Sequence, residues 1–354
     1  MVHAKFDETE KEQEYINTVK RLLNPHRPYL KIGKVKLGAG RTNDNLLVYD
    51  TDSKPVCVVR KSRLDRTNMA HFYFLQIQSL EREKFLLEYI GKHAPKVPIP
   101  RLIAADQDPE DGLDYLVVSH ISGINFADIA GSLTPNQYNN YMRNLGETIA
   151  PVSNLTFGSF GIIGPDGIII NPFQRWSDRI AFSIYGKLKD PASTEYFTHE
   201  LLFEKIPEFI EKHREALDKN RRPTAVLYDL HSKNFNVDPT TEKITGFFDI
   251  GLGLIANRTL EFVPIELNTV NFGKTERPAA LEAFFEGYGL SLKDRADYEA
   301  AKPVYALNHS LGAVLAYHNN PVDDLRRDLW SREVFKPRVE EIVEKGIVNM
   351  VRWF

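Results

Sequence analysis

The chain has 354 residues, with 45 basic and 48 acidic side chains and a formal net charge of −3. This length suffices for two lobes that each bury a core, and the near-neutral charge argues against a nucleic acid or a membrane surface as the main partner. A single cysteine, Cys57, excludes an intrachain disulfide, and residues 1–23 lack the apolar stretch of a secretory signal, so we expect a reducing, cytoplasmic environment.

The first part of the chain predicts a small lobe of helix and sheet. Residues 8–23 carry apolar side chains at helical spacing, and from Ile32 the period changes to that of strands in "KIGKVKLGAGRTNDNLLVYD" and "PVCVVRKS". Residues 75–92 return to a helical period, and "DYLVVSHISG" is typical of a short apolar strand. This order of elements predicts an α+β lobe over residues 1–119.

The remainder, residues 120–354, is predicted to be mainly helical. The exceptions are "GIIGPDGIII", where a hairpin is expected around Pro165-Asp166-Gly167, and the strand pair formed by "FNVD" and "KITGFFDIG". Several amphipathic helices are expected over residues 276–352. A small mixed lobe joined to a larger helical one predicts a ligand site between the two.

The stretch "LYDLHSKNFNVD" places polar side chains among apolar ones in the second lobe. Asp229 and Asn234 are five residues apart, and Asp249 follows fifteen residues later at the end of a predicted strand, in an Asp-x-Gly. This spacing is typical of phosphoryl transfer from a nucleotide, in which the first Asp accepts or orients the proton of the attacking hydroxyl while the Asn and the second Asp hold Mg²⁺. The alternative is that Asp229 and Asn234 cap a turn. We favour chemistry because three such residues occur together.

The whole segment "LYDLHSKNFNVDPTTEKITGFFDIGLG" resembles the Brenner motif and metal-binding segment of the aminoglycoside phosphotransferase and choline kinase superfamily. The pattern of that family is His-Gly-Asp-Leu-His-x-x-Asn, followed by Ile-Asp-(Phe/Trp)-Gly. The resemblance implies that Asp229 is the catalytic aspartate, that His231 is the second histidine of the motif, and that Asn234 and Asp249 bind the metal. It also implies a bilobal, protein-kinase-like α+β fold, with an antiparallel sheet and one helix in the N-terminal lobe and a mainly helical C-terminal lobe.

This sequence departs from the family pattern at two places. Leu227-Tyr228 stands where the family has His-Gly, and Ile250 replaces the aromatic residue after the metal aspartate. Loss of the first histidine affects the support of the loop more than its chemistry, and the bulk of Tyr228 is expected to reshape the substrate side. We interpret His231 as a residue that orients the loop by hydrogen bonds, with a direct catalytic role as the alternative.

The segment "LGAGRTNDNLLVYD" falls where the family has its nucleotide-positioning loop. The resemblance implies that the backbone around Gly38 and Gly40 holds phosphate and that Thr42 and Asn43 add hydrogen bonds. A plain hairpin turn is the alternative.

The strand "VCVVRKS" falls where the family places a cation against the nucleotide phosphates. Alternation along a strand allows only one of Arg60 and Lys61 to face the site, and we favour Arg60, which shares a face with Val58. Glu83 matches the helix glutamate that pairs with this cation. The alternatives are a solvated basic edge and an ordinary exposed helix charge.

Two further positions follow from the same resemblance. Backbone groups from Val118 to His120, in "LVVSHISG", fall on the hinge that binds the adenine edge. Glu261, in "LEFVPIELN", fits an acidic residue that braces the catalytic loop.

The expected activity is therefore Mg²⁺-dependent transfer of a phosphoryl group from ATP or GTP to a hydroxyl of a small molecule. An aminoglycoside is favoured over a metabolite alcohol, and no oligomeric state is predicted. A polycationic aminoglycoside would need an acidic pocket, for which the chain offers Glu261, Glu266, Glu282, Glu286, Asp323 and Asp324. The alternative is a catalytically inactive nucleotide-binding module.

Overall fold

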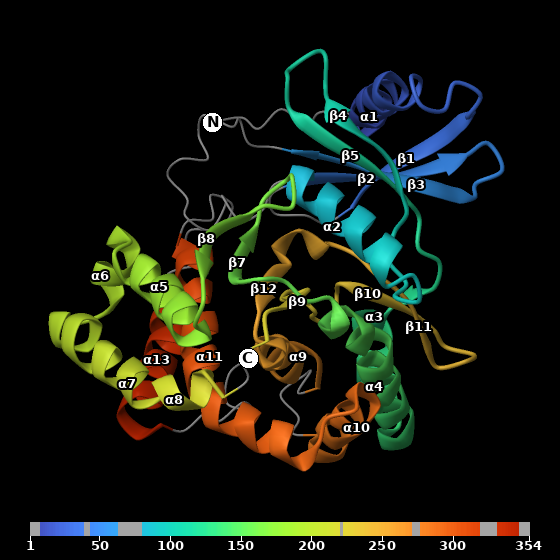
Figure 1. The fold of residues 1–354 in the computed structure, drawn as a ribbon. Helices are drawn as coiled ribbons and strands as arrows, with labels where there is room; N and C mark the ends of the chain where they lie inside the picture. Colours follow the sequence, from blue (N-terminus) through green and yellow to red (C-terminus); the bar gives the residue numbers. More distant parts are fainter. Residues whose placement is uncertain are drawn as a thin grey trace.

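The N-terminal lobe is built on one antiparallel sheet. The computed structural model describes residues 8–38, 43–62, 80–219, 222–270, 277–318 and 331–346. Five strands pair in the order β1-β2-β3-β5-β4 (Figure 1). They are β1 (Ile32–Gly38), β2 (Asn43–Asp50), β3 (Pro55–Ser62), β4 (Leu102–Gln107) and β5 (Asp114–Ser119).

Two helices cover opposite faces of this sheet. Helix α1 (Glu8–Leu23) packs Val19, Leu22 and Leu23 into a core with Cys57 and Val59 of β3. Helix α2 (Leu80–His93) lies on the other face, in the larger core that continues into the second lobe. Side chains alternate along a strand, so Val58 and Arg60 of β3 both point toward the face that α2 covers.

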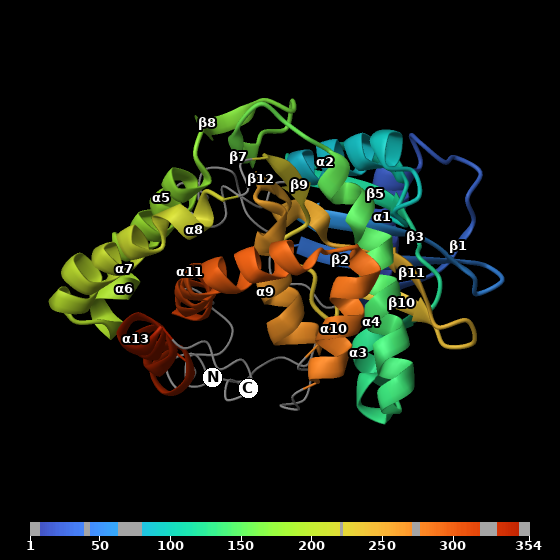
Figure 2. The ribbon, with the colours of Figure 1, turned by 60° about the horizontal axis from the view of Figure 1, so that its bottom comes forward.

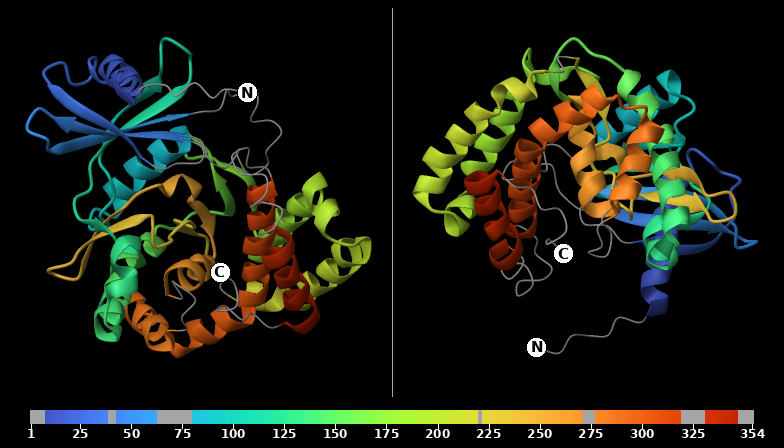
Figure 3. Two further views of the ribbon diagram at one scale, coloured as in Figure 1. Left: turned by 180° about the vertical axis from the view of Figure 1, so that it is seen from behind. Right: turned by 90° about the horizontal axis from the view of Figure 1, so that it is seen from below.

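The C-terminal lobe is mainly helical, as predicted. Figures 2 and 3 show α11 lying beside α5 and α13, while α4 and α10 form a separate pair. The helices are α3 (Phe126–Ile129), α4 (Pro135–Ile149), α5 (Trp176–Leu188), α6 (Pro191–Tyr196), α7 (Ile206–Lys212), α8 (Arg214–Leu217), α9 (Phe262–Ile265), α10 (Pro278–Tyr288), α11 (Leu292–His318) and α13 (Lys336–Lys345).

Glycines allow α4 and α10 to approach each other closely. A Cβ atom on Gly146 would lie 2.3 Å from the Phe284 carbonyl oxygen, and one on Gly287 would lie 1.9 Å from the Arg143 carbonyl oxygen. Both distances are impossible for real atoms, so this contact requires glycine on each helix.

Short strands frame the predicted site. One sheet has the order β11-β10-β6 and another the order β8-β7-β12-β9. The β7–β8 hairpin confirms the turn predicted around Gly167, which has a φ of 81°. The strands are β6 (Ile124–Asn125), β7 (Phe160–Ile163), β8 (Ile169–Phe173), β9 (Thr224–Val226), β10 (Phe235–Asp238), β11 (Lys243–Phe247) and β12 (Leu254–Ala256).

None of the helices in the described ranges has both the length and the apolar character needed to cross a lipid bilayer.

Candidate active site

The loop between β9 and β10 carries the predicted catalytic residue. Asp229 follows β9, and the Asn234 side chain binds it twice, with Nδ2 2.9 Å from the Asp229 carbonyl oxygen and 3.3 Å from Oδ2. His231 lies beside it, with Nε2 3.9 Å from Asp229 Oδ1, and its Nδ1 accepts from the Lys233 backbone N–H at 3.2 Å. The Asp229 side chain is 31% exposed, so this carboxylate residue is partly accessible to solvent.

Strand pairing brings Asn234 next to the second aspartate. Phe235 pairs with Phe247, and the Phe248 N–H donates to the Asn234 carbonyl oxygen at 3.0 Å. Asp249, the next residue, has left-handed backbone angles of φ 59° and ψ 49° as the chain turns into a short 3₁₀ helix. The three residues predicted from spacing therefore lie at one end of the β10–β11 pair.

Arg60 of β3 joins the two lobes at this point. Its Nη1 donates to Glu83 Oε1 of α2, and its Nη2 donates to Asp249 Oδ1 at 2.6 Å. Arg60 and Glu83 are 6% and 4% exposed, so both charges are buried and each compensates the other. The structure thus brings together the cation and the helix glutamate that the sequence proposed as partners, and it adds Asp249, which the sequence assigned to the metal.

Lys61 points to the opposite face of the sheet. Its ammonium binds Asp108, which Arg21 of α1 also contacts, and it binds Asp111 at 2.5 Å. These two cations hold the pKa of the Asp108 carboxyl well below its usual range, although burial acts in the opposite direction. Lys61, which the sequence left open as a phosphate contact, is therefore separated from Asp249 by the sheet.

The remaining nucleotide-site candidates divide between described and undescribed parts of the chain. Gly38 ends β1 opposite Asn45, and Asn43 begins β2, whereas Gly40 and Thr42 lie outside the described residues.

At the hinge, the Val118 side chain is buried and its residue pairs with both β3 and β4. The backbone N–H groups of Ser119 and His120 donate to the carbonyl oxygens of Arg101 and Val56. Two of the N–H groups expected to meet adenine are thus already bonded within the sheet.

The backbone conformation of Tyr228 was not predicted from the sequence, in which the only unusual feature here is a tyrosine where the family pattern has glycine. Its φ is 63°, in the left-handed region that favours glycine, which is the residue the family pattern has here. Two contacts hold this backbone: Glu261, 1% exposed, accepts from the backbone N–H groups of Leu227 and Tyr228. The Tyr228 hydroxyl accepts from Asn308 Nδ2 of α11 at 3.2 Å. Asn308 was not among the predicted site residues because it lies 80 residues away.

The donor set fits Mg²⁺. Asn234 binds Asp229 through its amide nitrogen, which leaves Oδ1 as an oxygen ligand, and the Asp249 side chain is 45% exposed with one oxygen on Arg60. Mg²⁺ prefers oxygen ligands and retains several waters, so one amide and one carboxylate suffice. No group of three or more His, Cys, Asp or Glu side chains suited to a metal occurs in the described ranges.

The acidic residues expected to form a pocket for a polycation are dispersed. Glu266 binds Tyr298 and Lys302, Glu282 binds Arg295, and Glu286 binds Arg143 of α4. Glu261 is used in the catalytic loop, and Asp323 and Asp324 lie outside the described residues. The described members of this set therefore do not converge on Asp229.

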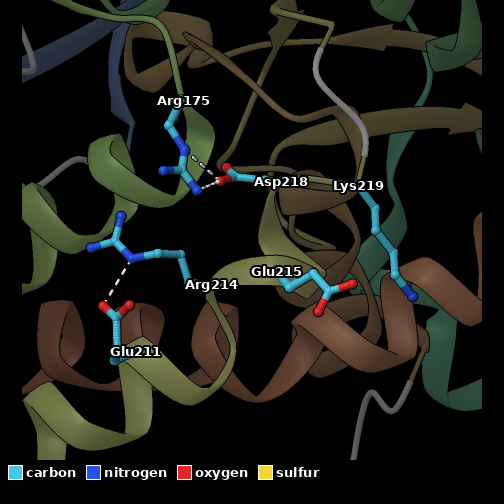
Figure 4. A pocket seen from close by; sticks show the side chains of 6 residues that line it. All are labelled: Arg175, Glu211, Arg214, Glu215, Asp218 and Lys219. Atoms are coloured by element: carbon cyan, nitrogen blue, oxygen red, sulfur yellow. Dashed lines mark hydrogen bonds and ion pairs between the residues drawn. The ribbon is translucent and has the colours of Figure 1, made fainter.

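A polar hollow of about 480 Å³ lies at the N-terminal end of α5 rather than at Asp229 (Figure 4). Asp218 accepts there from Arg175 and from the Ser177 backbone N–H at 2.8 Å, while Arg214 binds Glu211. Because these charges are paired with one another, we interpret the hollow as a structural feature of the helix end.

A sequence model of the phosphotransferase enzyme family matches residues 35–304 of this chain. This range is more than half of the 354 residues and contains Arg60, Asp229 and Asp249. The chain belongs to the phosphotransferase enzyme family. Among curated protein sequences none matches this chain.

Solved structures of phosphotransferases have the same bilobal fold. An aminoglycoside phosphotransferase in complex with GDP and kanamycin is 14% identical, with a TM-score of 0.64 over 93% of this chain and 98% of the other. Another, in a ternary complex with streptomycin and ATP, is 13% identical, with a TM-score of 0.59 over 97% and 99%. A candidate fructosamine-3-kinase from Thermobifida fusca is 17% identical, with a TM-score of 0.58 over 88% and 99%. At such identities the likeness establishes the protein-kinase-like α+β fold, and the family establishes a small-molecule phosphotransferase.

Proposed function

We propose that this phosphotransferase moves the γ-phosphoryl group of ATP or GTP to a hydroxyl of a small molecule in an Mg²⁺-dependent reaction. The observation that carries the proposal is the contact of Arg60 with both Glu83 and Asp249, beside the Asp229–Asn234 pair. This arrangement joins a phosphate-binding cation, two oxygen ligands for a metal and an accessible carboxylate. Structural neighbours in complex with GDP and with ATP support a nucleotide co-substrate.

Each residue has a defined task in the transfer. The acceptor oxygen forms a bond to the γ-phosphorus, the bond from phosphorus to the bridging β–γ oxygen breaks, and the nucleoside diphosphate leaves. Asp229 orients the hydroxyl and takes its proton, while His231 and Asn234 hold the loop. Arg60 binds the phosphates, and Asn234 and Asp249 would hold Mg²⁺, which would supply positive charge to the phosphate oxygens.

The acceptor expected from the family resemblance is an aminoglycoside, the class of molecule in two of the neighbouring complexes. Aminoglycosides are therefore included among the acceptors in the following test. The test is nucleotide turnover with Mg²⁺ by the full chain, with ATP and GTP in parallel and a panel of aminoglycosides and small alcohols. Phosphorylated product is identified by mass, and Asp229→Ala and Asp229→Asn are assayed beside the native protein.

Product formed by the native protein and lost in both variants supports the proposal. If neither nucleotide turns over and neither binds, the chain is instead an inactive module of the same fold. Asp178→Asn provides a matched control, because Asp178 is a carboxylate on the outer part of α5 that pairs with Arg214.

A further inference from the structure

Lys187 is a buried lysine that has no task in the phosphoryl transfer described above. It lies in the last turn of α5, is 7% exposed, and bonds across the contact between α5 and α11 (Figure 2). Its bonded partners in the described part of the chain are neutral oxygens of Asn308 and Ser183. Burying an amine in such surroundings is costly, and burial is the main cause that lowers the pKa of Lys187 to about 7. An apolar side chain would avoid this cost, which points to a role for the amine.

The ammonium group of Lys187 fixes the side chain of Asn308. Its Nζ donates to the carbonyl oxygen and to Oδ1 of Asn308 at 3.0 and 2.5 Å, and to Ser183 Oγ at 3.4 Å. Three oxygens match the three N–H donors of the charged form, which cannot accept a hydrogen bond. Because Lys187 holds two oxygens of one residue, the Asn308 side chain keeps one rotamer, with Oδ1 toward Lys187 and Nδ2 away from it.

Ser183 cannot fix this amide by itself. Its Oγ donates to Asn308 Oδ1 at 3.1 Å, but a hydroxyl can equally accept from an amide nitrogen. The donor-only ammonium therefore selects the orientation of the amide, and Ser183 follows it.

The free end of the Asn308 amide holds the residue before Asp229. Asn308 is 3% exposed, and its Nδ2 donates to the Tyr228 hydroxyl at 3.2 Å. Tyr228 is thus held from two sides, since Glu261 accepts from its backbone N–H. The left-handed φ of 63° at Tyr228 is a conformation that a residue with a Cβ atom rarely keeps without such contacts. Because Asp229 is the next residue, the direction of its carboxylate depends on how Tyr228 is held.

We propose that Lys187 is a positioning residue for phosphoryl transfer, which fixes the direction of the Asp229 carboxylate through Asn308 and Tyr228. This role rests on the task of Asp229 in the phosphotransferase function proposed above. Lys187 acts on the turnover step and not on nucleotide binding, because the connection ends in the catalytic loop and does not reach Arg60 of β3.

The connection is measured first without turnover, by hydrogen exchange of the full chain followed by mass. Lys187→Met keeps the length of the buried side chain and removes its three donors. Exchange in a peptide over residues 227–234 is divided by exchange in the α2 peptide, residues 80–93, so that a change in global stability cancels. Lys187→Met should raise this exchange ratio by about tenfold.

Lys302→Met is the matched control. It makes the same substitution at a buried lysine of α11, 8% exposed, whose ammonium binds Glu266 at 2.8 Å. The change leaves the Glu266 carboxylate buried without this partner, so it should lower the free energy of unfolding. The exchange ratio should nevertheless stay within about twofold of that of the native protein.

The kinetic measurement is the part of Mg²⁺-dependent hydrolysis of ATP or GTP by water that Asp229→Ala abolishes, because it requires no identified acceptor. Lys187→Met should lower its kcat by about tenfold or more and leave the KM for the nucleotide within about twofold. Adding Tyr228→Phe to Lys187→Met should cost less than about twofold further, since both changes cut the same connection. All measurements are made below pH 7, where the charged form of Lys187 predominates.

Two substitutions of Asn308 distinguish a hydrogen-bonded connection from packing. A carboxylate accepts both from Lys187 and from the Tyr228 hydroxyl, so Asn308→Asp should keep kcat within about threefold of the native value. Asn308→Leu replaces the amide by an apolar group and should lower kcat as far as Lys187→Met does.

The positioning role is overturned if Lys187→Met and Lys302→Met give the same exchange ratio, or if Lys187→Met leaves kcat unchanged. It is also overturned if the effects of Lys187→Met and Tyr228→Phe add in full, or if Asn308→Asp loses as much activity as Asn308→Leu. A native protein with neither Asp229-dependent hydrolysis nor nucleotide binding would count against the phosphotransferase function itself. The exchange ratio would still decide whether Lys187 holds the loop.

Discussion

Arg60 donates to Asp249 across the two lobes, with 2.6 Å between Nη2 and Oδ1, while its other terminal nitrogen binds Glu83. One guanidinium therefore ties β3 of the sheet, helix α2 and the Asp-x-Gly turn together. Gly251 borders this junction, where a Cβ atom would lie 3.4 Å from Glu83 Oε2, an ordinary van der Waals contact.

Replacing Arg60 separates its role from that of Lys61. Arg60→Ala leaves the Glu83 carboxylate buried without its partner, which costs about 3–5 kcal/mol of the free energy of unfolding. Arg60→Ala should also raise the KM for the nucleotide. Arg60→Lys should recover part of the stability and part of the nucleotide affinity, because lysine keeps the positive charge but lacks the planar guanidinium group. Urea unfolding and steady-state kinetics measure these effects.

Lys61→Ala is the matched control for that experiment. It removes a contact with Asp108 on the far face of the sheet and should lower stability while leaving the nucleotide KM unchanged. A larger rise in nucleotide KM for Lys61→Ala than for Arg60→Lys would contradict the assignment.

Asp249→Asn tests the metal site. The variant keeps the shape of the side chain but removes the anionic oxygen, so the Mg²⁺ concentration for half-maximal rate should rise and kcat/KM should fall by about 10²-fold or more. Because the Asp249 side chain is 45% exposed, stability should change by less than about 1 kcal/mol. Mg²⁺ titrations that superimpose for the native protein and the variant would show that Asp249 is not a metal ligand.

Tyr228→Phe tests the tie between the catalytic loop and α11. The change leaves Asn308 Nδ2 without its acceptor, at a cost of about 1–3 kcal/mol in unfolding free energy. The KM for the acceptor should rise while the KM for the nucleotide stays constant, since Arg60 and Glu83 are not touched. Equal rises in both KM values would mean that the hydroxyl supports the whole loop rather than its acceptor side.

Glu261 makes stability depend on pH. Burial raises the pKa of this carboxyl from 4.5 to about 8, although the N–H groups of Leu227 and Tyr228 oppose the shift. The folded protein therefore keeps a proton that the unfolded chain loses, so this contribution to stability falls as the pH rises from 4.5 to about 8 and is constant above that. Glu261→Gln cannot ionise and should lack this component of the pH dependence. The measurement is the unfolding free energy of both proteins across this pH range. Parallel curves for the native protein and the variant would refute the assignment.

Asp218 tests the interpretation of the hollow in Figure 4 as structural. Asp218→Ala removes the acceptor of the Ser177 backbone N–H at the start of α5, which should cost about 0.5–2 kcal/mol, the usual effect of losing a helix cap. Kinetic constants for the nucleotide should be unchanged. A specific loss of turnover without loss of stability would make the hollow a functional site.

Much of the candidate site follows from local patterns in the sequence. The spacing of Asp229, Asn234 and Asp249 implies one strand–loop–strand unit, and pairing of β10 with β11 brings them to one end of it. Alternation along β3 separates Arg60 from Lys61, and the structure places these two side chains on opposite faces. Such rules need no knowledge of distant residues, because strand geometry has a period of two.

Other features depend on the packing of helices that are far apart in the sequence. The sequence by itself determined the two-lobed order of elements and which residue types stand in the predicted catalytic loop. Only the tertiary structure decided that Glu266, Glu282 and Glu286 disperse into separate ion pairs, and that Lys187 and Asn308 meet Tyr228. The charge of a pocket is set by which helix faces meet across it, and that depends on long-range packing and not on local period.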